Sequence, residues 1–139
     1  MMIAIDTDKK FIDELGAMLR KILPEEKFTG FTSVQECFEY VRGHEAEIVF
    51  FTIDEKYPDH RRENILYELR KMVPDLDFVL LGKSKILDNA TALWSIQNRC
   101  SDYVSKPLTP EKLIRSLSDI WYHRIPEQTL MNAMSDISK

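Results

Sequence analysis

The sequence predicts an α/β fold in which five strands form one doubly wound parallel sheet with helices on both faces. Three observations lead to this prediction. Short apolar runs alternate along the chain with segments whose apolar residues recur at helical spacing. The middle apolar runs, above all residues 48–53, lack polar alternation, which is typical of strands buried on both faces. The length of 139 residues suits a single domain with one hydrophobic core.

The first strand and helix are marked by an abrupt change of pattern. Residues 2–5 are a short apolar run that stops at Asp6, and they predict a buried strand. Apolar residues then follow at helical spacing over residues 11–23, and Pro24 ends that helix. Residues 27–32 are less apolar, so we expect a second, more exposed strand there.

The second helix begins at a capping box. The hydroxyl of Ser33 and the carboxylate of Glu36 are spaced to accept hydrogen bonds from each other's backbone amides. The helix presents one apolar face that includes Cys37, and it closes near Gly43. Residues 48–53 then form the most apolar run of the chain, which predicts the central strand.

The second half of the chain repeats the alternation after a polar loop over residues 54–62. The expected elements are a helix over 65–72 ended by Pro74, a buried strand over 78–81 broken by Gly82, a helix over 90–97, a short strand over 102–105 and a helix over 109–121. Thr109 is placed to cap the last helix, and Pro110 suits its first position, where a missing N–H costs nothing. Right-handed crossovers then make a doubly wound parallel sheet the economical arrangement.

Charge and composition exclude several classes of function. The formal net charge is −4, from 19 basic and 23 acidic residues, whereas a protein that holds nucleic acid through phosphate contacts is normally basic. No apolar run approaches the 18 residues that a membrane helix needs, and residues 1–6 do not read as a signal peptide. The two cysteines, Cys37 and Cys100, suit a reducing compartment, so we expect a cytoplasmic protein. Cys37 is expected to be a small core residue.

Charged residues follow the first and last expected strands, where doubly wound sheets bind their ligands. Asp6 and Asp8 come directly after the first strand and are candidates for a Mg²⁺ site. Alternatively, Asp8 caps the first helix. Lys106, which precedes Pro107 after the last strand, points into the same cleft, where it would hold a phosphoryl oxygen or neutralise the carboxylates.

Three segments carry a resemblance to a known family. They are residues 5–11, with the acidic cluster; residues 48–53, with the central strand; and residues 102–108, with an aromatic-x-x-Lys-Pro pattern. With them, residues 1–123 resemble a receiver domain of bacterial two-component response regulators, which has a flavodoxin-like fold. Residues 124–139 are then a C-terminal tail or linker, either a dimerising extension or the start of a connection to an output domain.

The resemblance implies a set of roles at the strand ends. In the family, an aspartate ending the third strand accepts a phosphoryl group from a histidine kinase. An acidic pair binds Mg²⁺, and a Ser or Thr hydroxyl after the fourth strand senses the phosphoryl group. An aromatic residue on the fifth strand switches rotamer, and Tyr103 occupies that position. Tyr103 is equally well read as a half-buried edge tyrosine.

The sequence departs from the family at three of these positions. Aligning strand on strand puts Thr52 at the acceptor position, Gly82 at the hydroxyl position and Thr7 at the second carboxylate. The positions that keep the family's residue types are Asp6, Tyr103 and Lys106. A threonine hydroxyl without a neighbouring base is a poor nucleophile, so this alignment predicts a degenerate receiver.

A second alignment, shifted by two residues, restores an acceptor at Asp54 and a hydroxyl at Ser84. The intervals are family-like, with 30 residues from Asp54 to Ser84 and 22 from Ser84 to Lys106. It places polar Thr52 inside the third strand, however, where apolar burial is expected. Burial fixes strand register more strongly than loop spacing does, so Thr52 is the favoured acceptor position and Asp54 the alternative.

These readings predict a non-enzymatic signalling domain that works by protein–protein contact, with a histidine kinase or an output domain as partner and with a homodimer as a further option. On this reading it needs no cofactor. The alternative is a working receiver, phosphorylated on Asp54 with Mg²⁺. A flavodoxin-like cofactor binder is disfavoured because the acidic loop at Asp6 and Asp8 would repel a phosphate ester. We also expect Lys106 to form an ion pair with Asp6 or Asp54.

Overall fold

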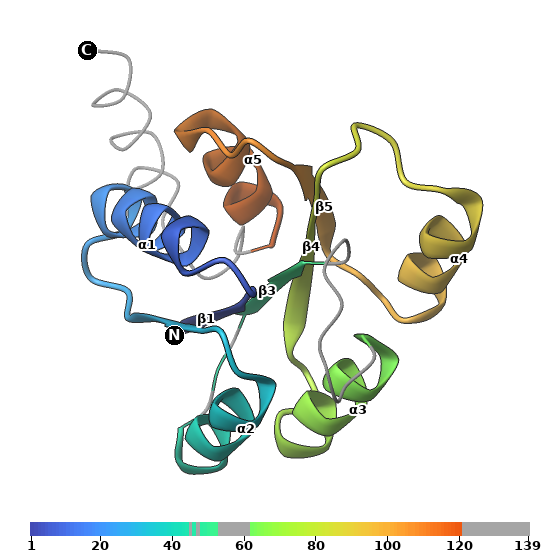
Figure 1. Ribbon diagram of the computed structural model, residues 1–139, viewed down its shortest axis with the longest axis horizontal. Helices are drawn as coiled ribbons and strands as arrows, with labels where there is room; N and C mark the ends of the chain where they lie inside the picture. The colour runs from blue at the N-terminus through green and yellow to red at the C-terminus, as the bar shows by residue number, and fades with distance from the viewer. Residues whose placement is uncertain (45, 47, 53–61, 121–139) are drawn as a thin grey trace.

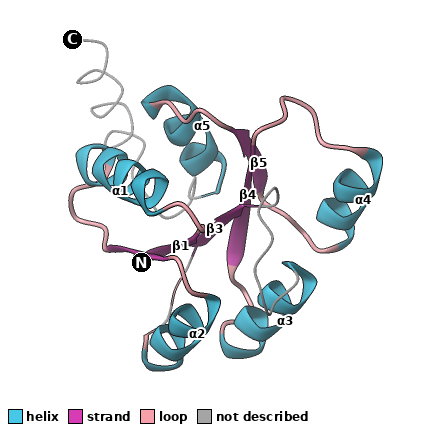
Figure 2. Ribbon diagram, viewed as in Figure 1, coloured by secondary structure: helices cyan, strands magenta, loops and turns pink. Residues whose placement is uncertain are grey.

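The computed structural model describes residues 1–44, 46, 48–52 and 62–120, and in residues 51, 52, 62 and 63 it describes the backbone alone. Five parallel strands form one sheet in the order β2-β1-β3-β4-β5, and helices cover both of its faces (Figures 1 and 2). The strands are β1 (Met2–Ile5), β2 (Phe28–Phe31), β3 (Ile48–Thr52), β4 (Asp77–Gly82) and β5 (Asp102–Ser105). The helices are α1 (Lys9–Ile22), α2 (Val34–Gly43), α3 (Arg62–Met72), α4 (Asn89–Gln97) and α5 (Pro110–Ile120). The predicted doubly wound parallel sheet is confirmed.

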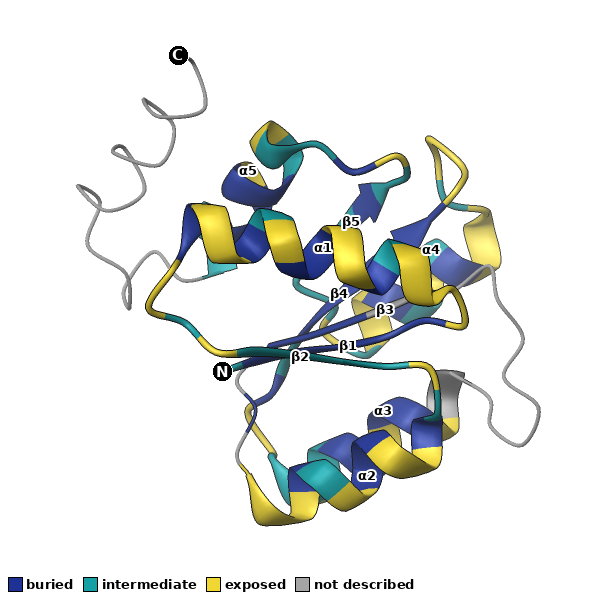
Figure 3. Ribbon diagram, turned by 60° about the vertical axis from the view of Figure 1, so that its left-hand side comes forward, coloured by how far each residue is buried: buried dark blue, intermediate teal, exposed yellow. Residues whose placement is uncertain are grey.

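Two apolar layers separate the sheet from its helices. Figure 3 shows buried residues along the strands and on the helices that cover them. On one face, α1 and α5 pack against alternate strand residues such as Phe50 and Leu81. On the other face, α2, α3 and Trp94 of α4 pack against the residues between them, such as Val49 and Phe78. β1 is buried on both faces along its whole length, which is why its sequence shows no polar alternation.

The N-caps predicted from the sequence are present at the starts of α1, α2 and α5. The Asp8 carboxylate accepts hydrogen bonds from the backbone N–H groups of Lys10 and Phe11, and so caps α1. The Ser33 hydroxyl oxygen accepts from the backbone N–H of Glu36 at the start of α2. Thr109 does the same at the start of α5, which confirms it as the predicted cap.

Gly82 does not break the fourth strand, contrary to the sequence prediction. It is the last residue of β4, is buried, and pairs with Ser105 of β5. Its carbonyl also accepts a hydrogen bond from the backbone N–H of Lys106 at 2.7 Å. The ladder therefore continues through the glycine, because the neighbouring strand supplies partners up to and beyond it.

Two parts of the prediction lie outside the described residues. The polar loop before α3 is described only from Arg62 onward, and α5 is described only as far as Ile120. The expected end of the domain near residue 123 and the tail over 124–139 are therefore untested. Among the helices that the structure does describe, none has the length and apolar character needed to cross a membrane.

Candidate functional site at the carboxyl ends of the strands

The candidate site lies where the parallel strands end, at one edge of the sheet. The register aligns Ile5 of β1 with Phe51 of β3, so Asp6 comes level with Thr52, the last residue of β3. Thr52 pairs in turn with Leu81, one residue before the end of β4. The topology therefore brings residues distant in sequence to one edge, as expected for a doubly wound sheet.

Asp6 is the buried acidic centre of this edge. Its side chain is 0% exposed. One carboxylate oxygen, Oδ1, accepts a hydrogen bond from the backbone N–H of Asp8 at 2.8 Å. The other, Oδ2, lies 2.9 Å from the ammonium nitrogen of Lys106. The predicted ion pair of Lys106 is confirmed, with Asp6 as its partner; Asp54, the alternative partner, lies outside the described residues.

The ammonium of Lys106 is held on a second side by an aromatic ring. Its Nζ atom lies 4.0 Å from the centroid of the Phe11 ring, and its side chain is 14% exposed. A cation over a ring face is attracted by the ring quadrupole, more strongly when water is excluded. Lys106 therefore lies between a carboxylate and a ring from the start of α1.

Lys112 braces the segment that carries Lys106, a role that sequence reasoning missed. Its Nζ atom donates to the Ser105 carbonyl at 3.0 Å, to the Ser105 hydroxyl at 3.3 Å and to the Pro107 carbonyl at 3.0 Å. It thereby ties the first turn of α5 to the end of β5. The only signal in the sequence is a lysine three residues after the Thr109 cap, which is too common to be informative.

The two described acidic candidates for a magnesium site, Asp6 and Asp8, both have partners within the protein. Asp6 is engaged by Lys106 and by the Asp8 amide, and Asp8 caps α1. Nowhere among the described residues do three His, Cys, Asp or Glu side chains gather in a way that could hold a metal ion. Asp54, the third acidic candidate, lies outside the described residues. A Mg²⁺ site at Asp6, Asp8 and Asp54 therefore stays a prediction.

Gly82, at the end of β4, and Tyr103 of β5 lie in close contact. A Cβ atom built on Gly82 would lie 2.5 Å from the Tyr103 hydroxyl oxygen, 2.9 Å from its Cε2 and 3.1 Å from its Cζ. The hydroxyl of Tyr103 donates to the backbone carbonyl of Ser84. Tyr103 is half-buried, and its ring occupies the space that a side chain at position 82 would need.

Thr52 and Ser84, the remaining site candidates, are only partly described. Thr52 is the last described residue of β3 and its side chain is not described, so its place as the acceptor position stays a prediction. Ser84 lies two residues beyond β4 and is exposed. Ser84 as the hydroxyl position of the alternative alignment also stays a prediction.

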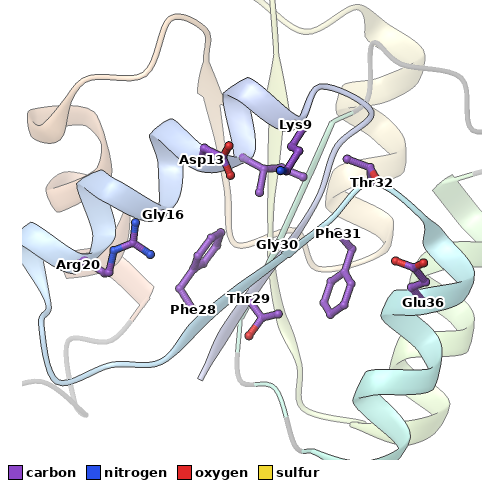
Figure 4. Close-up of a pocket in the computed structure, with 11 residues that line it drawn as sticks. Lys9, Asp13, Gly16, Arg20, Phe28, Thr29, Gly30, Phe31, Thr32 and Glu36 are labelled. Carbon is purple, nitrogen blue, oxygen red and sulfur yellow. The ribbon is translucent and has the colours of Figure 1, made fainter.

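Two grooves run along α1. One of about 450 Å³ includes Asp8, Phe11, Lys83, Lys106 and Leu108, and so opens beside the Lys106 ion pair. The other, of about 440 Å³, runs along the free edge strand β2 between α1 and α2 (Figure 4). It contains none of the predicted site residues.

The outer face of α4 exposes large apolar side chains. Leu93 is 57% exposed and Ile96 is 77% exposed, and Ile86 in the preceding loop is 84% exposed. Trp94 points the other way, its ring centroid 5.7 Å from that of Phe78. Trp94 therefore packs against the core, while its neighbours Leu93 and Ile96 on α4 are exposed.

Comparison with known proteins shows the fold of the chain. No protein-family model matches the sequence, and no curated protein sequence matches it. Solved structures do match. A response regulator receiver domain protein from Clostridium thermocellum is 17% identical, with 99% of this chain and 95% of the other covered and a TM-score of 0.67.

Two further solved structures are also similar in fold to this chain. The chemotaxis protein CheY4 of Vibrio cholerae is 11% identical, with a TM-score of 0.73 over 86% of this chain and 96% of the other. A CheY-like receiver domain protein from Methanospirillum hungatei is 15% identical, with a TM-score of 0.70 over 97% and 96%. The chain therefore has the flavodoxin-like fold of receiver domains, as the sequence motifs suggested.

Proposed function

We propose that this chain is a signal-transduction receiver domain that acts through protein–protein contacts and is not switched by aspartyl phosphorylation. The fold shared with receiver domains supports the first part of the proposal. The second part rests on the residues at the strand ends. On this proposal the domain catalyses no reaction, requires no cofactor and works in the cytoplasm.

The observation that carries the second part is the packing of Tyr103 against Gly82. In the favoured alignment, position 82 is where the family has a hydroxyl side chain that senses the phosphoryl group. Here it has no side chain, and the Tyr103 ring lies within 2.9 Å of where a Cβ atom would be. A phosphoryl group on the neighbouring strand would find no hydroxyl at this position to attract.

The internal pairing of the charged residues supports the same conclusion. Lys106 pairs with the buried carboxylate of Asp6, and Asp8 is used as a helix cap. The lysine and the described carboxylates thus satisfy one another without a ligand. Neutralisation of the carboxylate is one of the two tasks expected of this lysine.

The exposed apolar residues of α4 and its preceding loop support a role in protein contact. Large apolar side chains that gather on one surface commonly mark an interaction site. We propose that Ile86, Leu93 and Ile96 contribute to binding a protein partner, such as a histidine kinase or an output domain. Formation of a homodimer is the second option for this surface.

The test is to incubate the purified chain with Mg²⁺ and a small-molecule phosphodonor, and to measure its intact mass. We expect no phosphoryl adduct. The positive control is a well-characterised receiver domain that is treated in the same way.

Two other results would contradict the proposal. A phosphoryl adduct that disappears in the Asp54→Asn variant would overturn the proposal in favour of a working receiver. That outcome would make Asp54 the acceptor and Ser84 the nearest hydroxyl. Bound flavin, visible in the absorbance spectrum of the purified protein, would instead indicate a cofactor-binding protein.

A further inference from the structure

We propose that the pocket between the C-terminal ends of α3 and α4 binds an acidic segment of a protein partner, with one apolar side chain of that segment packed beside the Tyr67 ring. The pocket has a volume of about 360 Å³ and is lined by Leu66, Tyr67, Arg70, Lys71 and Asn98. We call it the basic pocket. The inference rests on the part of the proposed function that assigns protein contact to the domain, and it adds a second surface and the chemistry of its partner.

The basic pocket lies at the opposite edge of the sheet from Lys106. α3 and α4 cover the same face of the sheet, and each returns the chain to the amino end of the next strand (Figure 1). The guanidinium of Arg70 donates to the carbonyl of Leu76, one residue before β4, and to that of Arg99, three residues before β5. A partner bound here therefore leaves Asp6 and Lys106 uncovered.

Arg70 places a positive charge in the wall of the pocket. Its guanidinium donates to the backbone carbonyls of Leu76, Asn98 and Arg99, all of which are uncharged. Its central carbon lies 4.9 Å from the centroid of the Phe78 ring. In the part of the chain that the structure describes, no carboxylate forms an ion pair with Arg70. Its charge is therefore held in place without being neutralised.

Arg99 adds a second guanidinium in a backbone conformation that costs free energy. It follows Asn98, the C-cap of α4, and its φ angle of 59° lies in the left-handed region that favours glycine. Burial lowers the pKa of Arg70 and the charge of Arg99 lowers it further, so the two side chains repel each other. A glycine at position 99 would avoid both costs, which points to a contact that only the guanidinium makes.

Tyr67 and Lys71 form the exposed rim of the basic pocket. Tyr67 is 64% exposed, and the Nζ atom of Lys71 lies 5.4 Å from the centroid of its ring. The described ion pair of Lys71, with Glu68, spans 4.0 Å between exposed side chains and is therefore weak. Tyrosine and arginine often carry much of the binding energy of protein interfaces. The rim thus offers a ring to an apolar side chain and an ammonium to a carboxylate beside it.

The distribution of charge determines which class of partner fits. The chain as a whole has a formal net charge of −4, whereas Arg70, Lys71 and Arg99 gather positive charge at this one place. A short acidic segment matches the local charge. The long run of phosphates in a nucleic acid would also meet the negative charge of the rest of the chain. A second copy that used the same pocket would oppose like charges.

A peptide-display selection on the full chain tests the inference. From a library of short random peptides we expect enrichment of sequences with Asp or Glu on either side of a large apolar residue. The strongest binder is then synthesised with a fluorescent label, and its Kd for the full chain is measured by fluorescence anisotropy. Because the attraction is electrostatic, we expect the affinity to fall as NaCl is added.

Single variants locate the binding site of this labelled peptide. We expect Lys71→Glu and Tyr67→Ala each to weaken binding at least about tenfold. Lys21→Glu is the matched control, because Lys21 is an exposed lysine in the last turn of α1, as Lys71 is in the last turn of α3. It makes the same change of charge away from the pocket and should change the Kd less than about twofold. Circular dichroism checks that each variant is folded.

Arg99→Gly separates binding from folding. We expect the peptide to bind at least about tenfold more weakly, while the melting temperature stays the same or rises, because glycine adopts the left-handed conformation without cost. Backbone amide NMR signals provide the position. Signals of residues 66–71 and 98–99 should shift when the peptide is added, and those of Asp6 and Lys106 should not. A fall in melting temperature of more than about 4 °C in Arg99→Gly would show that Arg99 has a structural role and would contradict this argument.

Four other results would overturn the inference. They are a selection without acidic enrichment, equal peptide binding by the wild type and the pocket variants, a dimer in analytical ultracentrifugation that Lys71→Glu dissociates, and binding of a labelled single-stranded oligonucleotide that the same variant abolishes. The last two would assign the pocket to a second copy or to nucleic acid. The phosphodonor experiment probes the other edge of the sheet, so its result and this one can fail separately.

Discussion

The ammonium of Lys106 lies 2.9 Å from the fully buried carboxylate of Asp6, although the two residues are 100 positions apart in the sequence. The pair joins the end of β5 to the end of β1 across the carboxyl edge of the sheet. Removing one partner of a buried ion pair leaves the other charge without compensation. The pair is therefore the point at which the site is most sensitive to substitution.

We expect Lys106→Met to reduce the free energy of unfolding by about 3–5 kcal/mol, because it removes the ammonium that pairs with the buried Asp6 carboxylate. Urea denaturation followed by circular dichroism measures this loss. The double variant Asp6→Asn/Lys106→Met removes both charges and should lose clearly less than the single variant. A loss below about 1 kcal/mol in Lys106→Met would show that the pair behaves as an exposed one.

We expect Lys112 to stabilise the protein through hydrogen bonds to uncharged groups. Lys112→Met removes three hydrogen bonds, to the carbonyl and hydroxyl of Ser105 and the carbonyl of Pro107. We expect a loss of about 1–3 kcal/mol in urea denaturation, because partly buried acceptors lose a charged donor. Lys10→Met is the matched control at an exposed position and should change stability by less than about 0.5 kcal/mol. Equal effects of the two substitutions would contradict the bracing role.

The strands and the ion pair were predictable because they depend on burial and chain direction. β1 and β4 read as continuous apolar runs because nearly all their residues are buried. Asp6 and Lys106 each follow a parallel strand, so their meeting at one edge follows from the fold class. The Asp8 cap was predictable from its place before the first helical residues.

The features that could not be predicted from the sequence depend on contacts between different strands and helices. The packing of Tyr103 over Gly82 follows from the register of β4 against β5, which no local pattern specifies. Gly82 was therefore expected to break the strand that it in fact completes. Lys112 was missed for the same reason, since its three acceptors come from a loop whose path only the structure shows.

Two glycines should respond in opposite directions to the same substitution. A Cβ atom on Gly30 of β2 would overlap the Ile12 side chain of α1, whereas a Cβ on Gly43 would meet nothing within 4 Å. We expect Gly30→Ala to destabilise the protein by about 1–3 kcal/mol through overpacking. Gly43→Ala, at the last residue of α2, should change stability little or raise it by up to about 1 kcal/mol. Thermal unfolding distinguishes the two, and equal shifts would contradict the close packing of α1 on β2.

The Cys37 thiol should make stability fall at alkaline pH. Cys37 is fully buried in the layer beneath α2, and burial raises its pKa from an ordinary value of 9.0 to about 12. Above pH 9 the thiol ionises in the unfolded chain but stays protonated in the folded one, so unfolding releases a proton. The folded state accordingly loses about 1.4 kcal/mol per pH unit between about pH 9 and 12 from this group. Below about pH 8 the group contributes almost no pH dependence.

Comparison with Cys37→Ala isolates this contribution from other groups that titrate in the same range. The variant loses stability at neutral pH through the cavity it creates, but it lacks the thiol titration. The stability advantage of the wild type should therefore shrink as the pH rises from about 8 to 10.5. Native-state alkylation gives an independent check: Cys37 should react only after denaturant is added, with Cys100→Ser used to remove the other thiol. An advantage that stays constant with pH, or rapid alkylation in the folded state, would contradict the burial of the thiol.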